Sequence, residues 1–520
     1  MRSTVVRCGQ SLGGQSLGGQ SLGGRSLGGR LLGGIALALG LSPGLALAQQ
    51  TQTIPTTLEQ ALVEAYDTNP QLLQERANLR SVDENVPKAL GGWRPTVELN
   101  GSGGYTAENE RSVYGPTLFG PGGTVNTDLN RDTGTAEATI TQPVFEGGKT
   151  RASVFQAENQ VRAERANLIA TEGTVFFNVI SAYVGVIENR ALVAVNENNV
   201  AVLQEQLEST QDRFRVGELT QTDVAQSEAG LAQGQSELET AKGNLQTALA
   251  TYLQQVGEPA AATLADPQPL VLPVNSEISA DNLAAANNPT VIDALFTLAA
   301  SKNAVSLAFS ALMPTVNVQA STFVQANPQT PDANYTGWSV TANLTVPLYQ
   351  GGGEYATVRQ AKQNQDAAVQ SLDFDRRSAV QSASQAWETL VAAQAAITSS
   401  QSAVRANRIA LEGTEREAIV GTATTLDVLQ VQQNLLTAET TLVQNLASMV
   451  TASYGVAQAI GRLTARDLRL PVPYYDEDAY YNSVRDVLFG TGGPADPGNY
   501  LPPVVPAAGT QPGTQPGTQH

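Results

Sequence analysis

Apolar residues recur at every seventh position through two long stretches of the chain, and neither stretch contains a proline. A period of seven held over five heptads is typical of a coiled-coil seam, whereas a buried helix in a large core, the alternative, would not need so strict a period. From residue 148 to residue 217 such a helix would be about 100 Å long at about 1.5 Å per residue. The seam positions are Val179, Val186, Val193, Val200 and Leu207 in the first stretch and Ala383, Leu390, Ile397, Val404 and Leu411 in the second.

The two stretches belong to two copies of one unit. A Pro-x-aromatic-x-Gly-Gly segment precedes each stretch, starting at Pro143 and at Pro347, and a Val-Gly pair ends each one, at Gly217 and Gly421. The proline and the glycine are 74 positions apart in both copies (143 to 217 and 347 to 421). A rigid rod requires such constancy, so we expect one uninterrupted helix in each copy.

Ahead of each long helix the period changes from seven to two. This alternation predicts strands of about ten residues with one apolar face, two in each copy. A soluble antiparallel sheet would show the same alternation. Segments rich in Gly, Asn, Pro and Thr join the strands, and we expect loops there at about 106–135 and 327–337. The apolar positions are Val97, Leu99, Ala136, Ala138, Ile140 and Val144 in the first copy and Val316, Val318, Ala320, Val324, Trp338, Val340, Ala342 and Leu344 in the second.

Shorter helices surround these elements. Each copy opens with a short helix, continues after an Asn-Pro pair with a second one, and has a returning helix after the Val-Gly turn. The returning helix would reach about half the length of the outgoing one at 1.5 Å per residue. We expect the helix that starts at the Asn-Pro pair to supply the missing length, stacked end to end with the returning one. The predicted ranges are 58–66, 71–90 and 224–255 in the first copy and 280–286, 290–312 and 428–461 in the second.

The N-terminal 48 residues have the features of a secretory signal peptide. Four arginines and no acidic residue precede or enter the apolar run 31–47, which ends in small residues before Gln49. An uncleaved anchor is the alternative, although glycines and a proline interrupt the run. The Ser-Leu-Gly-Gly repeats within 11–30 form a low-complexity extension of this segment.

Charge and residue usage exclude several classes of function. All 48 acidic residues follow residue 48, whereas four of the 30 basic residues precede it, so the remaining chain carries a formal charge of −22. This excess argues against nucleic acid as a partner. Cys8 and His520 are the only cysteine and histidine, and we find no nucleophile paired with a base, no phosphate-binding loop and no metal-ligand spacing. We therefore expect neither an enzyme nor a bound cofactor or metal.

The predicted strands indicate how the chain would meet a membrane. No run of about 18 uninterrupted apolar residues follows the leader, so a spanning element would have to be a β-barrel. One chain offers four strands, whereas a closed barrel usually has about eight or more. Because open sheet edges do not occur in lipid, several chains would have to share one barrel.

With these features the chain resembles the TolC-type outer-membrane efflux proteins across about residues 55–480. The resemblance is carried by the duplicated helix–strand–strand–helix plan and by the two tip motifs, 213–224 and 418–428. The segment 461–468 and the tyrosines after it look like members that serve type I protein secretion. The resemblance implies a mainly α protein with a membrane β-barrel: a homotrimer with a twelve-stranded barrel in the outer membrane of a Gram-negative bacterium and a long α-helical tunnel in the periplasm.

The same resemblance implies partners and site residues. A trimeric exit duct of this family would work with a periplasmic membrane-fusion adaptor, an inner-membrane ABC or RND pump and outer-membrane lipid. The adaptor would dock on the two tips, whereas a glycine at a helix end is also common for backbone reasons alone. The tip residues are Val216, Gly217, Leu219, Val420 and Gly421.

Two aspartates match the pore constriction of the family. Asp427 corresponds to an acidic ring that narrows the closed pore, and Asp223 to the acceptor of links that hold it shut. A carboxylate in the first turn of a helix also stabilises that helix without any pore, which is the alternative for both. The other gate positions of the family hold Ala418, Ala423 and Gln430 here, so the closed state would have to be held in another way.

These features divide the chain and leave two classes of function open. The predicted regions are 1–48 signal peptide, 49–265 first repeat, 266–279 linker, 280–465 second repeat, 466–489 C-terminal equatorial segment and 490–520 disordered tail. The favoured function is an exit duct for type I secretion or multidrug efflux. A periplasmic coiled-coil scaffold or adhesin without a pore is the alternative, but a scaffold would not need an apolar strand face at four places.

Overall fold

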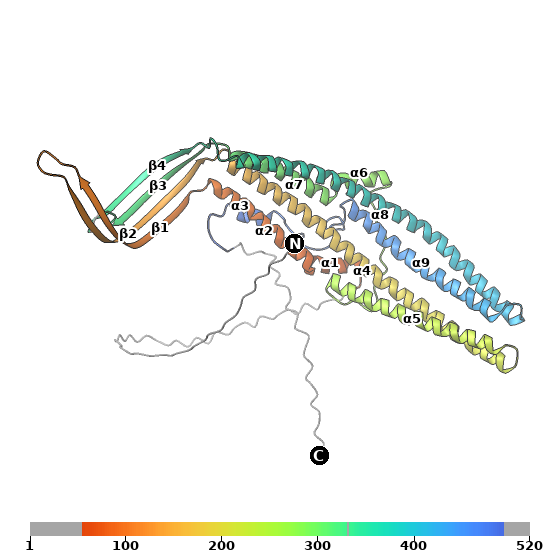
Figure 1. Ribbon diagram of the computed structural model, residues 1–520. Coiled ribbons are helices and arrows are strands. Elements are labelled where there is room, and N and C mark those ends of the chain that lie inside the picture. The colour runs from red at the N-terminus through yellow and green to blue at the C-terminus, as the bar shows by residue number, and fades with distance from the viewer. Residues whose placement is uncertain (1–54, 330–331, 493–520) are drawn as a thin grey trace, which may run out of the picture. The chain divides into compact units, whose positions relative to one another are not determined.

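The computed structural model describes residues 55–329 and 332–492. The predicted signal peptide and most of the predicted tail therefore lie outside the described residues. The order of elements repeats once along the chain (Figure 1). The elements are α1 (Leu58–Thr68), α2 (Pro70–Asp83), α3 (Asn85–Leu90), the 3-10 helix η1 (Gly91–Trp93), β1 (Thr96–Tyr114), β2 (Gly123–Phe145), α4 (Lys149–Arg215), α5 (Gln221–Val256), α6 (Glu277–Asn287), α7 (Pro289–Ser310), β3 (Thr315–Ala326), β4 (Asn334–Thr345), α8 (Gly353–Val420), α9 (Thr425–Ala459) and α10 (Ala479–Val484).

The two long helices are uninterrupted, as the heptad pattern predicts. Helix α4 has 67 residues and α8 has 68, which is about 100 Å each at 1.5 Å per residue. Val179 and Val186 on the first seam are fully buried, and so is Ala383 on the second. Each long helix packs along its returning helix, α4 with α5 and α8 with α9. Coiled-coil hairpins of this length place their tips far from the sheet.

One asparagine in each copy joins two helices end to end. The side-chain oxygen of Asn69 accepts a hydrogen bond from the Gln71 amide (3.0 Å) at the start of α2, and its amide group donates to the Gln255 carbonyl (3.0 Å) in the last turn of α5. Asn288 repeats this between α7 and α9, donating to the Ala459 carbonyl (2.8 Å). A single side chain thus satisfies both a free N–H and a free C=O at adjoining helix ends. The predicted end-to-end stacking is confirmed.

One predicted helix is broken in the structure. The range 71–90 divides into α2 and α3 at Glu84. Pro87 is the cause, because it lacks an N–H and its ring clashes with the carbonyl four residues earlier, that of Asp83. The corresponding helix of the second copy, α7, has no internal proline and stays continuous.

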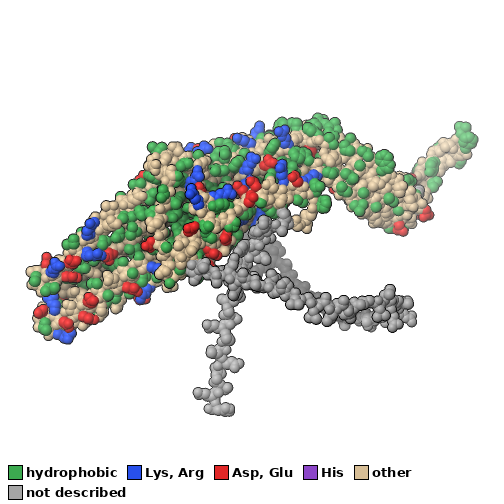
Figure 2. Space-filling view, turned by 180° about the vertical axis from the view of Figure 1, so that it is seen from behind, with side chains coloured by type: hydrophobic (Ala, Val, Ile, Leu, Met, Phe, Trp, Pro, Cys, Tyr) green, Lys and Arg blue, Asp and Glu red, His purple; other side chains and the backbone are tan. Residues whose placement is uncertain are grey.

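The four strands form one antiparallel sheet in the order β1-β2-β3-β4. Its register gathers the apolar positions on one face, where Val97, Ile140, Ala320 and Val340 lie side by side across the sheet. The neighbouring row on the other face is Glu98, Thr139, Ser321 and Ser339. The apolar face is uncovered in the described chain, with Val97 71% exposed, and few charged side chains lie over the sheet in Figure 2. The strand pattern therefore predicted the two faces correctly.

The first predicted loop is wrong. Strands β1 and β2 continue through most of 106–135, and only residues 115–122 form the turn. Beyond the pair Gly134 and Ala326 the two strands run on without a third strand (Figure 1). Cross-strand pairs stabilise this ribbon, among them a two-pronged ion pair from Arg131 to Glu108 (2.9 and 3.1 Å). Gly and Asn content indicated a loop, but side-chain pairing between the strands outweighs intrinsic propensity.

Two helical stretches of the described chain are long and apolar enough to cross a membrane by length and composition, Lys149–Arg215 and Glu277–Ser310. The sequence pattern had predicted none. In the first stretch, half of the most apolar 18-residue segment is buried inside the chain. The second stretch is not one continuous helix, because α6 ends and α7 begins at Asn288. Length and composition alone are weak grounds for a spanning helix, because a core helix passes the same test.

Candidate functional site: the helical tips and the C-terminal docking region

The two helix-to-helix turns are built alike. Gly217 and Gly421 follow the ends of α4 and α8 with φ of +82° and +83°, a left-handed conformation that glycine adopts at little cost. The next amide returns to the last helical turn, from Glu218 to the Arg213 carbonyl and from Thr422 to the Glu417 carbonyl, both at 2.9 Å. These hydrogen bonds satisfy carbonyl groups that would otherwise be unpaired at the helix end. The glycines are therefore required by the backbone, whatever else the tips do.

Each returning helix starts with a capping box. Asp223 accepts hydrogen bonds from the amide and hydroxyl of Thr220, at 2.9 and 2.7 Å, while its own amide donates to the Thr220 hydroxyl. Asp427 makes the same bonds with Thr424. The alternative reading of both aspartates, stabilisation of a helix start, is thus present in the structure.

The capping bonds also keep both carboxylates charged. Hydrogen bonds from the Thr220 hydroxyl and amide lower the pKa of Asp223 below its usual range, and the same bonds from Thr424 lower the pKa of Asp427. Asp223 is partly covered by its surroundings, whereas Asp427 is exposed. Asp427 is therefore the better placed of the two to project negative charge beyond its own chain.

Apolar side chains are exposed at both tips. Val216 and Val420 are 73% and 74% exposed, and Leu219 is half-buried. Ile419 and Leu426 are also exposed and were not singled out from the sequence, although each is an apolar residue beside a turn and off the heptad seam. Each tip thus presents exposed apolar side chains close to charged ones.

A buried polar bond connects the two coiled-coil hairpins. The amide of Gln432 in α9 donates to the side-chain oxygen of Asn199 in α4 (2.9 Å). Nearby, Leu429 of α9 packs against the cluster around Leu203, and Gly230 leaves it room because a Cβ there would lie 3.3 Å from the leucine. Sequence reasoning missed this contact, since the two partners are 233 positions apart.

The substituted gate positions play no part in this connection. Gln430 is exposed and donates to Asn434 in its own helix (3.3 Å), and Ala418 and Ala423 are half-buried at the second tip. Contact between the hairpins is made by Asn199, Gln432 and the leucines beside them, and Thr425 at the start of α9 adds a hydrogen bond to Asp223 of α5.

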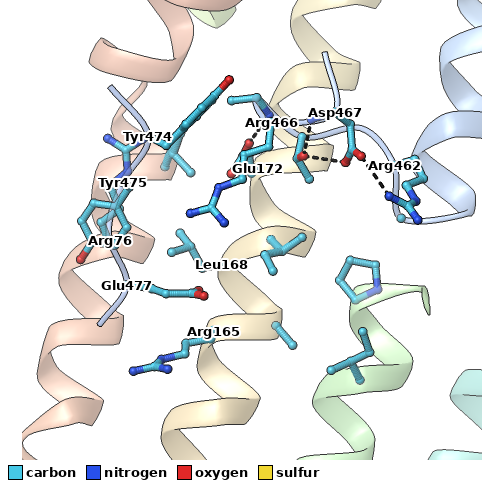
Figure 3. A pocket seen from close by; sticks show the side chains of 18 of the residues that line it. Arg76, Arg165, Leu168, Glu172, Arg462, Arg466, Asp467, Tyr474, Tyr475 and Glu477 are labelled. Atoms are coloured by element: carbon cyan, nitrogen blue, oxygen red, sulfur yellow. Dashed lines mark hydrogen bonds and ion pairs between the residues drawn. The ribbon is translucent and has the colours of Figure 1, made fainter. Parts of the chain in front are cut away.

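A second cluster of charged side chains surrounds a cavity of about 550 Å³ between α2, α4, the start of α7 and the segment 461–477 (Figure 3). The guanidinium of Arg76 lies 4.4 Å from the ring centre of Tyr66 and 5.2 Å from that of Tyr475. Glu172 accepts a hydrogen bond from the Ala465 amide, and burial raises its pKa although Arg76 and Arg466 oppose the shift. These contacts hold the C-terminal segment against the helices.

Asp83 lies beside this region as a buried, unpaired carboxylate. It is fully buried, and neither of its oxygens has a hydrogen-bond partner among the described residues. Burial raises its pKa to about 6, against the pull of Arg165, and the acidic groups of Asp478 and Glu84 raise it further. Arg165 instead forms an ion pair with Asp478 (2.7 Å). Nothing in the sequence pattern indicated this carboxylate.

Among the described residues, neither the tips nor the side chains around the cavity form a group suited to bind a metal ion. Across residues 55–329 and 332–492, no group of three or more His, Cys, Asp or Glu side chains is placed to hold a metal ion. The geometry favours docking and packing between chain segments.

Comparison with known proteins agrees with this geometry. The family described as "Outer membrane efflux protein" matches residues 61–258 and 282–462. The chain is 34% identical to outer membrane efflux protein BepC of Brucella suis, over 88% of this chain and 97% of that one, and 25% identical to outer membrane protein TolC of Escherichia coli, over 84% and 87%. The Campylobacter jejuni CmeC outer membrane channel has the same fold, with a TM-score of 0.67 at 15% identity over 78% of this chain and 85% of that one.

Proposed function

The chain belongs to the outer membrane efflux protein family, and we propose that three copies of it form one duct from the periplasm to the cell exterior. Members of the family are outer-membrane channels of Gram-negative bacteria that serve efflux or secretion and extend into the periplasm. This chain is such a channel. The number of copies, the docking surfaces and the cargo are the parts that we propose.

The sheet is the observation that carries the trimer. Its apolar face is uncovered, and among the described residues β1 and β4 have no further strand on their outer edges. In lipid such edges would leave backbone N–H and C=O groups unpaired. Pairing β1 of one copy with β4 of the next removes both edges, and three copies give twelve strands, enough for a closed barrel.

The tips supply the surface for a partner on the periplasmic side. TolC-like channels work with inner-membrane pumps and adaptors. We assign adaptor docking to Val216, Gly217, Leu219, Val420 and Gly421, because the tips combine exposed apolar side chains with turns that backbone hydrogen bonds and capping boxes hold in place. An ABC or RND pump in the inner membrane would then supply the energy.

We assign the pore constriction to Asp427, with Asp223 behind it. Three copies of an exposed, charged Asp427 around one axis would form a ring of negative charge at the narrow end of the duct. Such a ring would repel itself and attract cations, so its contribution is open to electrical measurement.

The experiment that tests the duct is membrane fractionation followed by conductance. We expect a chemically cross-linked trimer in the outer-membrane fraction and discrete conductance steps when it is added to planar bilayers. A monomer that stays in the soluble periplasmic fraction would contradict the proposal and favour the coiled-coil scaffold or adhesin.

Cargo is proposed at the level of class. The relative with 34% identity is named an efflux protein, which favours efflux as the class of transport. Type I protein secretion is the second candidate, because the segment after Gly461 packs as an ordered unit on α1 and α4 and resembles that of secretion members. Purifying the adaptor and the pump with the chain from detergent extracts would separate the two.

A further inference from the structure

Three consecutive apolar residues lie exposed near the end of the described chain. Val487, Leu488 and Phe489 follow α10 and are 46%, 69% and 90% exposed. The segment is ordered up to this point by contacts with the helices: the Tyr475 amide donates to the Tyr66 hydroxyl (2.9 Å), and the Tyr480 hydroxyl donates to Glu84 (2.9 Å). Apolar side chains held in the open at the end of a docked segment need a covering surface.

A hydrogen bond places this segment where the sheet meets the helices. Arg94, two residues before β1, donates from its guanidinium to the carbonyl of Val487 (2.8 Å). The exposed Trp93 beside it is bonded through its carbonyl to Gln142 at the end of β2 (3.0 Å). Trp93 and the segment 487–489 therefore lie at the helical end of the sheet, next to the edge of its uncovered apolar face.

Charge beside the segment fits a lipid headgroup layer. Arg94 bonds to the Val487 carbonyl, and Arg485 directly precedes the apolar residues in the chain together with Asp486. Glu84 lines the same surface hollow as the three apolar residues. A tryptophan and basic side chains next to exposed Leu and Phe are the features of a segment that lies in a membrane interface. The apolar sheet face, which continues from this level, supplies the hydrocarbon-facing surface that such an interface borders.

We propose that Val487–Phe489 inserts into the periplasmic leaflet of the outer membrane, with phospholipid as its partner. The proposal rests on the proposed duct, because it needs the sheet to stand in the membrane. It gives the C-terminal segment a role: one end is fastened to α2 and α4 and the other to the bilayer, so that the helices are held at a set level below the barrel.

Site-specific fluorescence tests the proposal in the full-length protein. We would label single cysteines, in a Cys8→Ser background, with the polarity-sensitive dye NBD and reconstitute the protein in nanodiscs of phosphatidylethanolamine and phosphatidylglycerol, with and without doxyl-labelled lipid. The test position is Phe489→Cys. Val340→Cys on the apolar sheet face and Val216→Cys at the tip are the matched controls for contact with lipid and with water.

The expected result is blue-shifted emission at position 489, with quenching by doxyl lipid about threefold or more above that at position 216. Water-like emission at 489, together with quenching at 340, would overturn the anchor and leave the duct intact. Blue-shifted emission at 489 without quenching would also overturn it, because another part of the assembly would then cover the segment. Absence of quenching at 340 would overturn the placement of the sheet and the anchor with it.

Discussion

Helices α4 and α8 have nearly the same length and the same kind of tip, yet they stand in different surroundings. Of the 67 residues of α4, 22 are buried, against 7 of the 68 in α8. Helix α4 packs against α1, α2, α3, α5, α7 and α9, whereas α8 contacts α6, α7 and α9. Duplication of a sequence plan thus reproduced the elements but not their environments. In this chain α4 is a core helix, and α8 presents a face that another copy could cover.

The largest effect is expected from removing a core ring of α4. Phe176 is fully buried, and Phe176→Ala should lower the free energy of unfolding by about 3–5 kcal/mol through lost burial and a cavity. Urea unfolding followed by circular dichroism measures this change.

The matched variant on α8 is Phe374→Ala, which removes an exposed ring. It should leave the unfolding of the single chain within about 0.5 kcal/mol and weaken association between copies instead, as seen by cross-linking. Equal losses of stability in the two variants would contradict the difference in burial between α4 and α8.

The bond between the hairpins gives the next effect. Asn199→Ala removes the partner of Gln432 and leaves its buried amide unpaired, so stability should fall by about 1–3 kcal/mol. The double variant Asn199→Leu with Gln432→Leu should recover most of this loss. If the bond also holds the hairpins together, both variants should raise single-channel conductance.

Ser400→Ala is the control for the hairpin bond. Ser400 bonds with Asn445 within the α8/α9 hairpin (2.6 Å), so its loss should cost stability without changing conductance. An unchanged conductance in the Asn199 variants would show that the bond is a packing contact only.

Asp83 predicts a pH dependence. Its pKa is about 6 in the folded chain and near 4 when unfolded, so between these values the folded chain binds more protons and the free energy of unfolding falls as pH rises. Asp83→Asn should therefore raise the free energy of unfolding by about 1–2 kcal/mol at pH 7.5 and leave it nearly unchanged at pH 4. The thermal midpoint at the two pH values measures this difference.

The groups that face Asp83 supply the control. The charged ones are Arg165 from α4, Glu84 next to it, and Glu477 and Asp478 from the C-terminal segment, which also brings three tyrosines close to Asp83. Asp478→Asn removes a charge that raises the pKa of Asp83 and frees Arg165 from its ion pair, so the fall of stability between pH 4 and pH 7.5 should become smaller. A gain of stability in Asp83→Asn that is equal at both pH values would exclude a raised pKa as its cause.

The smallest effect on stability is expected at the tips. Asp223→Asn and Asp427→Asn each weaken a capping box at a solvent-exposed helix start, so each should cost less stability than the variants above. The two variants should differ in their cation selectivity in planar bilayers. Asp427→Asn should reduce it more than Asp223→Asn does, because Asp427 is the exposed carboxylate. Equal selectivity in both would leave capping as the role of Asp427.

Much of the tip site was predictable because its chemistry is local. The left-handed glycine and the Thr-x-x-Asp box each lie within a few residues, so the motif alone indicates the turn. Ile419 and Leu426 went unnoticed because exposure depends on which helices surround the turn. Pro87 was visible in the sequence, and its break in the predicted helix 71–90 could have been read from it.

What the sequence by itself determined is what repeats along the chain: two rods of fixed length, strands with one apolar face, and asparagines that start helices. Tertiary structure alone decided the bond from Asn199 to Gln432, the burial of Asp83, the long β1–β2 ribbon and the unequal burial of α4 and α8. Periodicity records which face of an element is apolar. It does not show which distant segment packs on that face, and burial energies and pKa shifts depend on that packing.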